Sequence, residues 1–215
     1  AVMKQYIDKF AFKTVSSEEL RDAISEFTNI DMTDFFDTWV FTPGSPVYSV
    51  NSFSSKENGD KYDIEIEMNQ RHRGANHTGN SIRYELTFVD KDWNMQSEMI
   101  EWDNTNAIIT KTLDFEPIAI FCDYNNKFAD ACHSYNYIAN KTGNKEFKDA
   151  RIKLVAKEIS DSTLLRVEHR WVGANIVGKL SEGLTISPSR YWTIHRLDKG
   201  KSIINCEFQY QNTET

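Results

Sequence analysis

Histidines are the first residues to test for chemistry, because imidazole is both a general base and the commonest metal ligand. Five are present: His72 and His77 share a short polar run, while His133, His169 and His195 are isolated. A zinc hydrolase requires converging ligands and a carboxylate that takes a proton from the bound water, yet the sequence contains no His-Glu-x-x-His motif. We therefore expect no metal ligand and no catalytic residue, and we interpret His72 and His77 as part of a solvated loop.

Other sites of catalysis or cofactor binding are also missing from the sequence. No Gly-x-Ser-x-Gly motif is present, and the nine glycines are scattered singly, so neither a P-loop nor a dinucleotide-binding turn can form. Asp31, Asp34 and Asp37 could be read as a cation site, but they lie where a helix is expected to begin. Carboxylates at that position cap the helix and complement its dipole. We expect no cofactor in this chain.

The three cysteines, Cys122, Cys132 and Cys206, allow at most one disulfide and leave one thiol over. None belongs to a Cys-x-x-Cys pair. We interpret them as small buried apolar residues, since free cysteine is among the most buried residue types. Their pairing, and the cellular compartment, stay open.

Four tryptophans, Trp93, Trp102, Trp171 and Trp192, admit two interpretations. Indole rings exposed on one face of a sheet would form a stacking platform for sugars. Alternatively, the rings belong to the core, since Trp102 and Trp171 fall in or at the ends of alternating segments. We favour the core.

Composition narrows the class of protein. The net charge of −7 and the pI of about 5.3 argue against nucleic-acid binding, which requires a clustered basic surface. No run approaches the roughly 18 apolar residues of a membrane span. The 215 residues suffice for one large domain or two small ones. Because a periodic apolar pattern begins at the first residues, we expect that this chain is a piece cut from inside a larger protein.

Three helices are expected near the start of the sequence. The apolar spacing of residues 3–10 predicts the first. Ser16 and Glu19 form a capping box for the second, and Asp31 is expected to cap a third that carries Trp39. Proline and glycine at positions 43–46 end the helical region.

Beyond this turn the apolar period changes from about 3.6 to 2, which predicts strands. The fold class expected is mainly β with an N-terminal helical segment, followed by an antiparallel sandwich of the immunoglobulin or fibronectin kind and a second β unit whose completeness stays open. The expected boundaries are 1–45 for the helical segment, 46–130 for the sandwich, 131–146 for a linker and 147–215 for the second unit.

The stretch from Phe35 to Val47, Phe-Phe-Asp-Thr-Trp-Val-Phe-Thr-Pro-Gly-Ser-Pro-Val, resembles the end of the catalytic domain in the aminopeptidase N family of zinc metallopeptidases, the gluzincins. Residues 12–20 resemble that family's preceding helix. Strands that end in Gln70 and Asp123 are similar in rhythm to its small β domain. Residues 161–172 and 187–192 resemble the additional C-terminal module of Bacteroidetes-type members.

This resemblance implies a non-catalytic C-terminal region that shapes the cavity of a zinc aminopeptidase. The family's zinc ligands lie upstream of everything matched, so zinc is expected in the parent and none of the ligands transfers here. The implied partner is the rest of the catalytic domain, contacted through residues 1–45, with a dimer through the same surface as another outcome. The implied location is periplasmic, cell-surface or secreted. The alternative is a carbohydrate- or protein-binding sandwich module of an exported protein.

Overall fold

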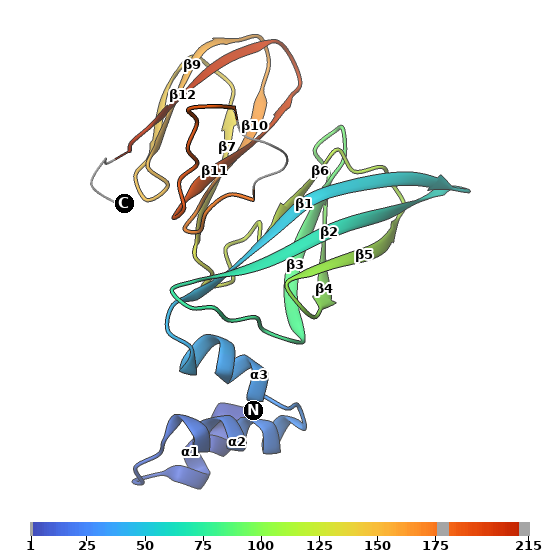
Figure 1. Ribbon diagram of the computed structural model, residues 1–215. Coiled ribbons are helices and arrows are strands. Elements are labelled where there is room, and N and C mark those ends of the chain that lie inside the picture. Colours follow the sequence, from blue (N-terminus) through green and yellow to red (C-terminus); the bar gives the residue numbers. More distant parts are fainter. Residues whose placement is uncertain (1, 176–180, 211–215) are drawn as a thin grey trace. The chain divides into compact units, whose positions relative to one another are not determined.

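The computed structural model describes residues 2–175 and 181–210 (Figure 1). The protein is mainly β, with 49% of these described residues in strands and 15% in helices. A short helical segment comes first and antiparallel sheets follow. The fold class expected from the change in apolar period is therefore confirmed.

The helical segment contains α1 (Val2–Phe10), α2 (Ser17–Thr28), α3 (Thr33–Phe36) and the π-helical turn η1 (Asp37–Phe41). The predicted capping box is present at α2: the Ser16 hydroxyl accepts from the Glu19 amide at 3.2 Å, and the Glu19 carboxylate accepts from the Ser16 amide at 2.8 Å. Both bonds satisfy amides that a helix start otherwise leaves without partners.

Gly44, in the turn between η1 and the first strand, is required by its geometry. Its φ of +104° belongs to the left-handed half of conformational space, which glycine adopts without strain. A Cβ at this position would lie 1.8 Å from the backbone oxygen of Arg73. The close approach of the two backbones thus depends on the missing side chain.

In the described part of the chain, twelve strands follow the turn, and they form four three-stranded sheets in the orders β1-β2-β5, β4-β3-β6, β11-β10-β7 and β12-β9-β8. Their bounds are β1 Ser45–Asn58, β2 Lys61–Arg73, β3 Ile82–Val89, β4 Met95–Trp102, β5 Asn106–Leu113, β6 Ala119–Cys122, β7 Cys132–Ala139, β8 Gly143–Phe147, β9 Ile152–Ile159, β10 Thr163–Arg170, β11 Tyr191–Asp198 and β12 Ser202–Phe208.

The chain divides into two compact units, residues 1–84 with 98–116 and residues 85–97 with 117–215. In the first unit, alternate residues of β2 are buried, as the pattern predicts: Ile64, Ile66 and Met68. Tyr48 and Tyr84 are also buried in this unit, with their ring centroids 4.7 Å apart. This unit also contains the helical segment.

The second unit has its core between sheets β11-β10-β7 and β12-β9-β8. Leu165 and Val167 of β10 are buried against Ile152 and Leu154 of β9 in one cluster. The expected linker at 131–146 differs from the structure, because β7 and the start of β8 fall within it. The polar side chains of β7 conceal its alternation: only Ser134 and Ala139 are buried, on opposite faces of the strand, and the residues around them include exposed or half-buried Asn, His and Tyr.

Candidate functional site

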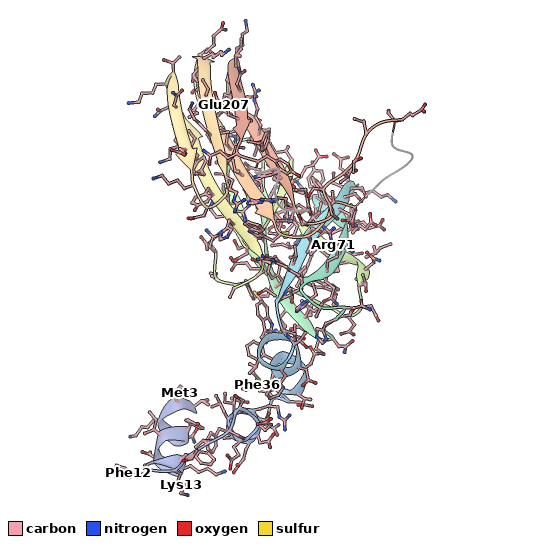
Figure 2. All side chains as sticks on the ribbon, turned by 60° about the vertical axis from the view of Figure 1, so that its left-hand side comes forward. Met3, Phe12, Lys13, Phe36, Arg71 and Glu207 are labelled. Atoms are coloured by element: carbon pink, nitrogen blue, oxygen red, sulfur yellow. The ribbon has the colours of Figure 1, made fainter. Side chains whose placement is uncertain are left out.

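The helical segment has a surface of exposed apolar side chains. No residue of α1 is buried, and Phe12 after it is fully exposed. Large apolar side chains exposed over residues 3–41 are Met3, Ile7, Phe12, Ile30, Phe35, Val40 and Phe41. Figure 2 labels Met3 and Phe12 near the two ends of α1. We call these seven residues the helical apolar surface; a stable monomer rarely exposes such a concentration of apolar side chains.

Weak contacts hold α1 against α2. The Lys9 ammonium lies 2.5 Å from the Glu26 carboxylate, and both side chains are solvent-exposed. The same ammonium lies 5.3 Å from the centre of the Phe27 ring and 5.5 Å from that of Phe10. Exposed ion pairs and cation–π contacts each contribute at most about 1 kcal/mol. Burial of α1 is thus incomplete within this chain.

His72 and His77, the two neighbouring histidines in the sequence, do come together. Their ring centroids are 5.6 Å apart and nearly perpendicular, and His77 Nε2 lies 3.0 Å from the Thr38 hydroxyl in η1. Burial lowers the pKa of His72, and His77 adds to this effect. Among the described residues, no group of three or more His, Cys, Asp or Glu side chains could hold a metal ion.

The three aspartates of the segment make separate local contacts instead of converging. The Asp31 carboxylate accepts from the Thr33 amide at 2.9 Å, but α3 begins at Thr33 with Met32 as its N-cap, so the prediction that Asp31 caps this helix is wrong by one position. Asp34 accepts from the Asn80 amide at 2.8 Å and so connects α3 to the loop before β3. Asp37 lies in η1.

The cysteines are free thiols that differ in exposure. Cys122 is buried and Cys132 is half-buried, but Cys206 is exposed. The interpretation as buried apolar residues therefore fails for Cys206, whose strand β12 lies at the edge of its sheet. Burial raises the pKa of the Cys132 thiol well above its usual range, which makes it a poor nucleophile.

A row of charges lies on β10, the central strand of its sheet, and was not anticipated from the sequence. All eight residues of β10 are buried. Arg166 Nε lies 2.8 Å from Glu168 Oε1, and Arg170 Nη2 lies 2.7 Å from Glu168 Oε2. Burial alone raises the pKa of Glu168, but Arg170, His195 and Arg166 outweigh it and hold that pKa far below its usual range.

Arg166 also connects β10 to its neighbours. Its guanidinium donates to Asn136 Oδ1 at 2.9 Å and to the Ser134 hydroxyl at 3.2 Å on β7. It donates further to the backbone oxygens of Cys122 and Asp123, where β6 ends. Because its partners are protein groups on three segments, we interpret Arg166 as a structural connector. Three alternating charges after the apolar residues Leu164 and Leu165 were the available sequence signal.

A second cluster lies on the opposite face of β10 and beyond its end. We call it the Trp171 cluster, and its members are His133, Arg151, His169, Trp171, Arg190, Trp192 and Tyr210. His169 is at its centre, directly opposite His133 on β7 and Trp192 on β11 in the strand register. The Trp192 ring stacks on the His169 imidazole with a centroid distance of 4.5 Å and an interplanar angle of 6°.

Cations surround the Trp171 ring within this cluster. The Arg151 guanidinium lies 5.1 Å from the ring centre and that of Arg190 lies 5.4 Å from it. Burial lowers the pKa of His169 to about 4, and the charges of Arg190, His133 and Arg151 reinforce the shift. His169 is therefore neutral at pH 7.

The four tryptophans considered as a sugar platform have different environments. Trp102 is 6% exposed and packs edge-on against Tyr48 and Tyr84, as a core residue does. Trp93 is half-buried beneath the Lys199 ammonium, which lies 4.5 Å from its ring centre. Trp171 and Trp192 are half-buried in the Trp171 cluster. The structure thus brings together only two of the four, through His169.

Comparisons with family models and with curated proteins give no relative from which a function could be transferred. Within residues 2–175 and 181–210, the structure contains no helix that is long and apolar enough to cross a membrane. No family model matches the chain, and no curated protein matches it.

Proposed function

We propose that this chain is the non-catalytic accessory region of a zinc aminopeptidase-like peptidase and that it packs against the catalytic domain through the helical apolar surface. Zinc and the catalytic residues belong to the parent's catalytic domain. Export to the periplasm, the cell surface or the medium accompanies this proposal, because the resembling family members are exported.

The observation that carries the proposal is the exposure of apolar side chains on residues 3–41. Ile7 and Met3 are 60% and 57% exposed on a helix without a single buried residue. An amphipathic helix of nine residues is unstable alone in water and requires a packing surface for its apolar face. A neighbouring folded domain would supply that surface. The resemblance of residues 35–47 to the end of an aminopeptidase catalytic domain supports such a domain as the neighbour.

The first experiment tests the chain for activity of its own. Zinc is measured by inductively coupled plasma mass spectrometry, and hydrolysis is measured on a panel of aminoacyl-nitroanilides. We expect neither bound zinc nor turnover. Stoichiometric zinc together with turnover would overturn the proposal and would direct attention to His72, His77 and His133 as ligands.

The second experiment tests the packing surface directly. The tagged chain is co-expressed with the catalytic domain of an aminopeptidase N family member that lacks its own β region, and co-purification is measured. We expect a stoichiometric complex with the unmodified chain and loss of the complex with Ile7→Asp. The matched control is Ile138→Asp, which changes a similarly exposed isoleucine on β7 (53% against 60%) and should leave the complex intact. Equal loss with both variants, or self-association through Ile7 without a complex, would contradict the proposal.

A further inference from the structure

The sheet β12-β9-β8 has two edge strands, and they differ in their protection against further strand pairing. Leu154 of the central strand β9 is buried in the core, and in the strand register it lies between Lys145 of β8 and Cys206 of β12. The Lys145 ammonium lies 5.9 Å and 5.8 Å from the ring centres of Tyr137 and Phe147, so it brings a charge to the core side of the β8 edge. Inward-pointing charges prevent an edge strand from pairing with another chain. The β12 edge has a thiol at the equivalent position.

Core-facing side chains of β12 are open to solvent, unlike their counterparts on β8. Ile152 of β9 lies between Phe147 of β8 and Phe208 of β12 in the register, and directly paired residues share a face of the sheet. Phe147 is 5% exposed, whereas Phe208 is 47% exposed even though its ring packs against Trp192. Cys206 is exposed as well. The core is therefore covered at the β8 edge and uncovered at the β12 edge.

The hydrogen bonds at the two ends of β12 show which of its backbone groups are directed toward β9. The Lys201 carbonyl oxygen accepts from the Ser160 amide at 2.9 Å, and the Gln209 amide donates to the Arg151 carbonyl oxygen at 2.8 Å. Both bonds are made by odd-numbered residues of this segment. Because the direction of bonding alternates along an antiparallel strand, the even-numbered residues direct their amides and carbonyls away from β9.

These even-numbered residues of β12 are Ser202, Ile204, Cys206 and Phe208. The Arg196 guanidinium donates to the Ser202 carbonyl oxygen at 2.7 Å, which agrees with the assigned direction and occupies that end of the edge. Among the described strands, β12 pairs with β9 alone. The backbone groups of Ile204, Cys206 and Phe208 thus form an open edge, which is a template for an additional strand.

We propose that β12 pairs antiparallel with β12 of a second copy of this chain, about a two-fold axis at Cys206. In this register Cys206 lies opposite its own counterpart, and Phe208 lies opposite Ile204 of the second copy. The three residues of each open edge then exchange about six backbone hydrogen bonds. A two-fold interface brings the same patch of both copies together, so the second copy offers a matching edge. This dimer is independent of the peptidase proposal and survives if that proposal fails.

The side chains on both faces of the strand fit this pairing. On the core face, the side chains of the two copies form one apolar row that covers the exposed Cys206 and Phe208. On the outer face, Glu207 lies opposite the neutral Asn205 of the second copy. The Glu207 carboxylate is also 2.9 Å from the Lys153 ammonium on β9, so its charge is compensated within each copy. Pairing therefore brings no uncompensated like charges together.

A register centred on Ile204 fits less well. It would place Ser202 opposite Cys206 of the second copy, although Arg196 already occupies the Ser202 carbonyl oxygen. It would also separate the two Cys206 residues by about 13 Å along the strands. In the register centred on Cys206 their Cα atoms are about 5.5 Å apart, which a disulfide can bridge. Disulfide formation at Cys206 therefore distinguishes the two registers.

The test uses the full chain with Ile7→Asp, because this substitution removes association through the helical apolar surface. Sedimentation equilibrium over a range of concentrations should show a monomer–dimer equilibrium. We expect a dissociation constant on the order of 100 μM, since a single pair of strands buries less area than a standard interface. Oxidation with copper–phenanthroline should then give a disulfide-linked dimer, and Cys206→Ser should prevent this cross-link.

Cys206→Lys gives β12 the inward charge that Lys145 gives β8, and it should weaken dimerisation by at least about tenfold. The matched control is Asn144→Lys, which adds the same charge at an exposed position of β8 and should leave the dimer intact. Circular dichroism verifies that both variants are folded, and the cross-link tests the interface without Cys206→Lys. A monomer at every concentration, an undiminished dimer in Cys206→Lys, equal weakening in both variants, or a dimer that forms no disulfide at Cys206 would overturn the proposal.

Discussion

Acidification should destabilise the second unit through His169. The pKa of this imidazole is lowered to about 4 by burial, with Arg190, His133 and Arg151 adding to the effect. In the unfolded chain its pKa is about 6.5. Between these two values the unfolded chain binds the proton and the folded protein does not, so stability is greatest above about pH 6.5 and falls as the pH decreases toward 4.

The magnitude follows from linkage. Each pKa unit corresponds to about 1.4 kcal/mol, and lowering the pH from about 7 to about 5 crosses most of the window between the two pKa values. The expected loss from His169 is about 2 kcal/mol. At pH 5 the Glu168 carboxylate contributes little to the change: its pKa is depressed by the fold, so its contribution to stability is lost only below the unfolded value of about 4.3.

The assay is urea denaturation at both pH values, followed by tryptophan fluorescence. The reference is His169→Phe, which retains a flat ring between Trp171 and Trp192 and loses only the weak 3.5 Å contact to the backbone oxygen of Asp149. The wild type should lose about 2 kcal/mol more than the variant on acidification. An identical pH dependence in the two proteins would refute the assigned environment of His169.

Three further substitutions test packing, each by urea denaturation. Arg166→Ala leaves the buried Glu168 with one guanidinium fewer and should lower the free energy of unfolding by about 3–5 kcal/mol. A loss below about 1 kcal/mol would show that the charge network on β10 does not stabilise the fold. Gly44→Ala places a methyl group against a backbone oxygen and should lower the free energy of unfolding by about 2–4 kcal/mol. The control is Gly59→Ala, where φ is +67° and the space around the residue is open, and it should lower this free energy by about 1–2 kcal/mol. Equal losses in the two variants would exclude the clash at Gly44. Ser16→Ala removes one bond of the capping box and should cost about 1 kcal/mol, and no measurable loss would contradict the assigned cap.

Local sequence patterns predicted the elements well where neighbouring residues decide the structure. The capping box at Ser16, the turn at Gly44 and the alternation of Ile64, Ile66 and Met68 each require only nearby chain, and each is present. The strand β7 was missed for a related reason. Its exposed Asn, His and Tyr residues give little apolar contrast, and pairing with β10 along its whole length makes it a strand.

The sequence by itself determined a mainly β protein with a helical start, because apolar periodicity and turn residues act over a few positions. Only the tertiary structure decided which charges are buried. Arg166 and Glu168 look like surface residues along the chain, but β10 lies between two other strands and has both faces covered, so their charges must satisfy one another. The Trp171 cluster likewise depends on strand register, since its residues are up to 77 positions apart, from His133 to Tyr210, and meet only because antiparallel pairing brings their strand ends together.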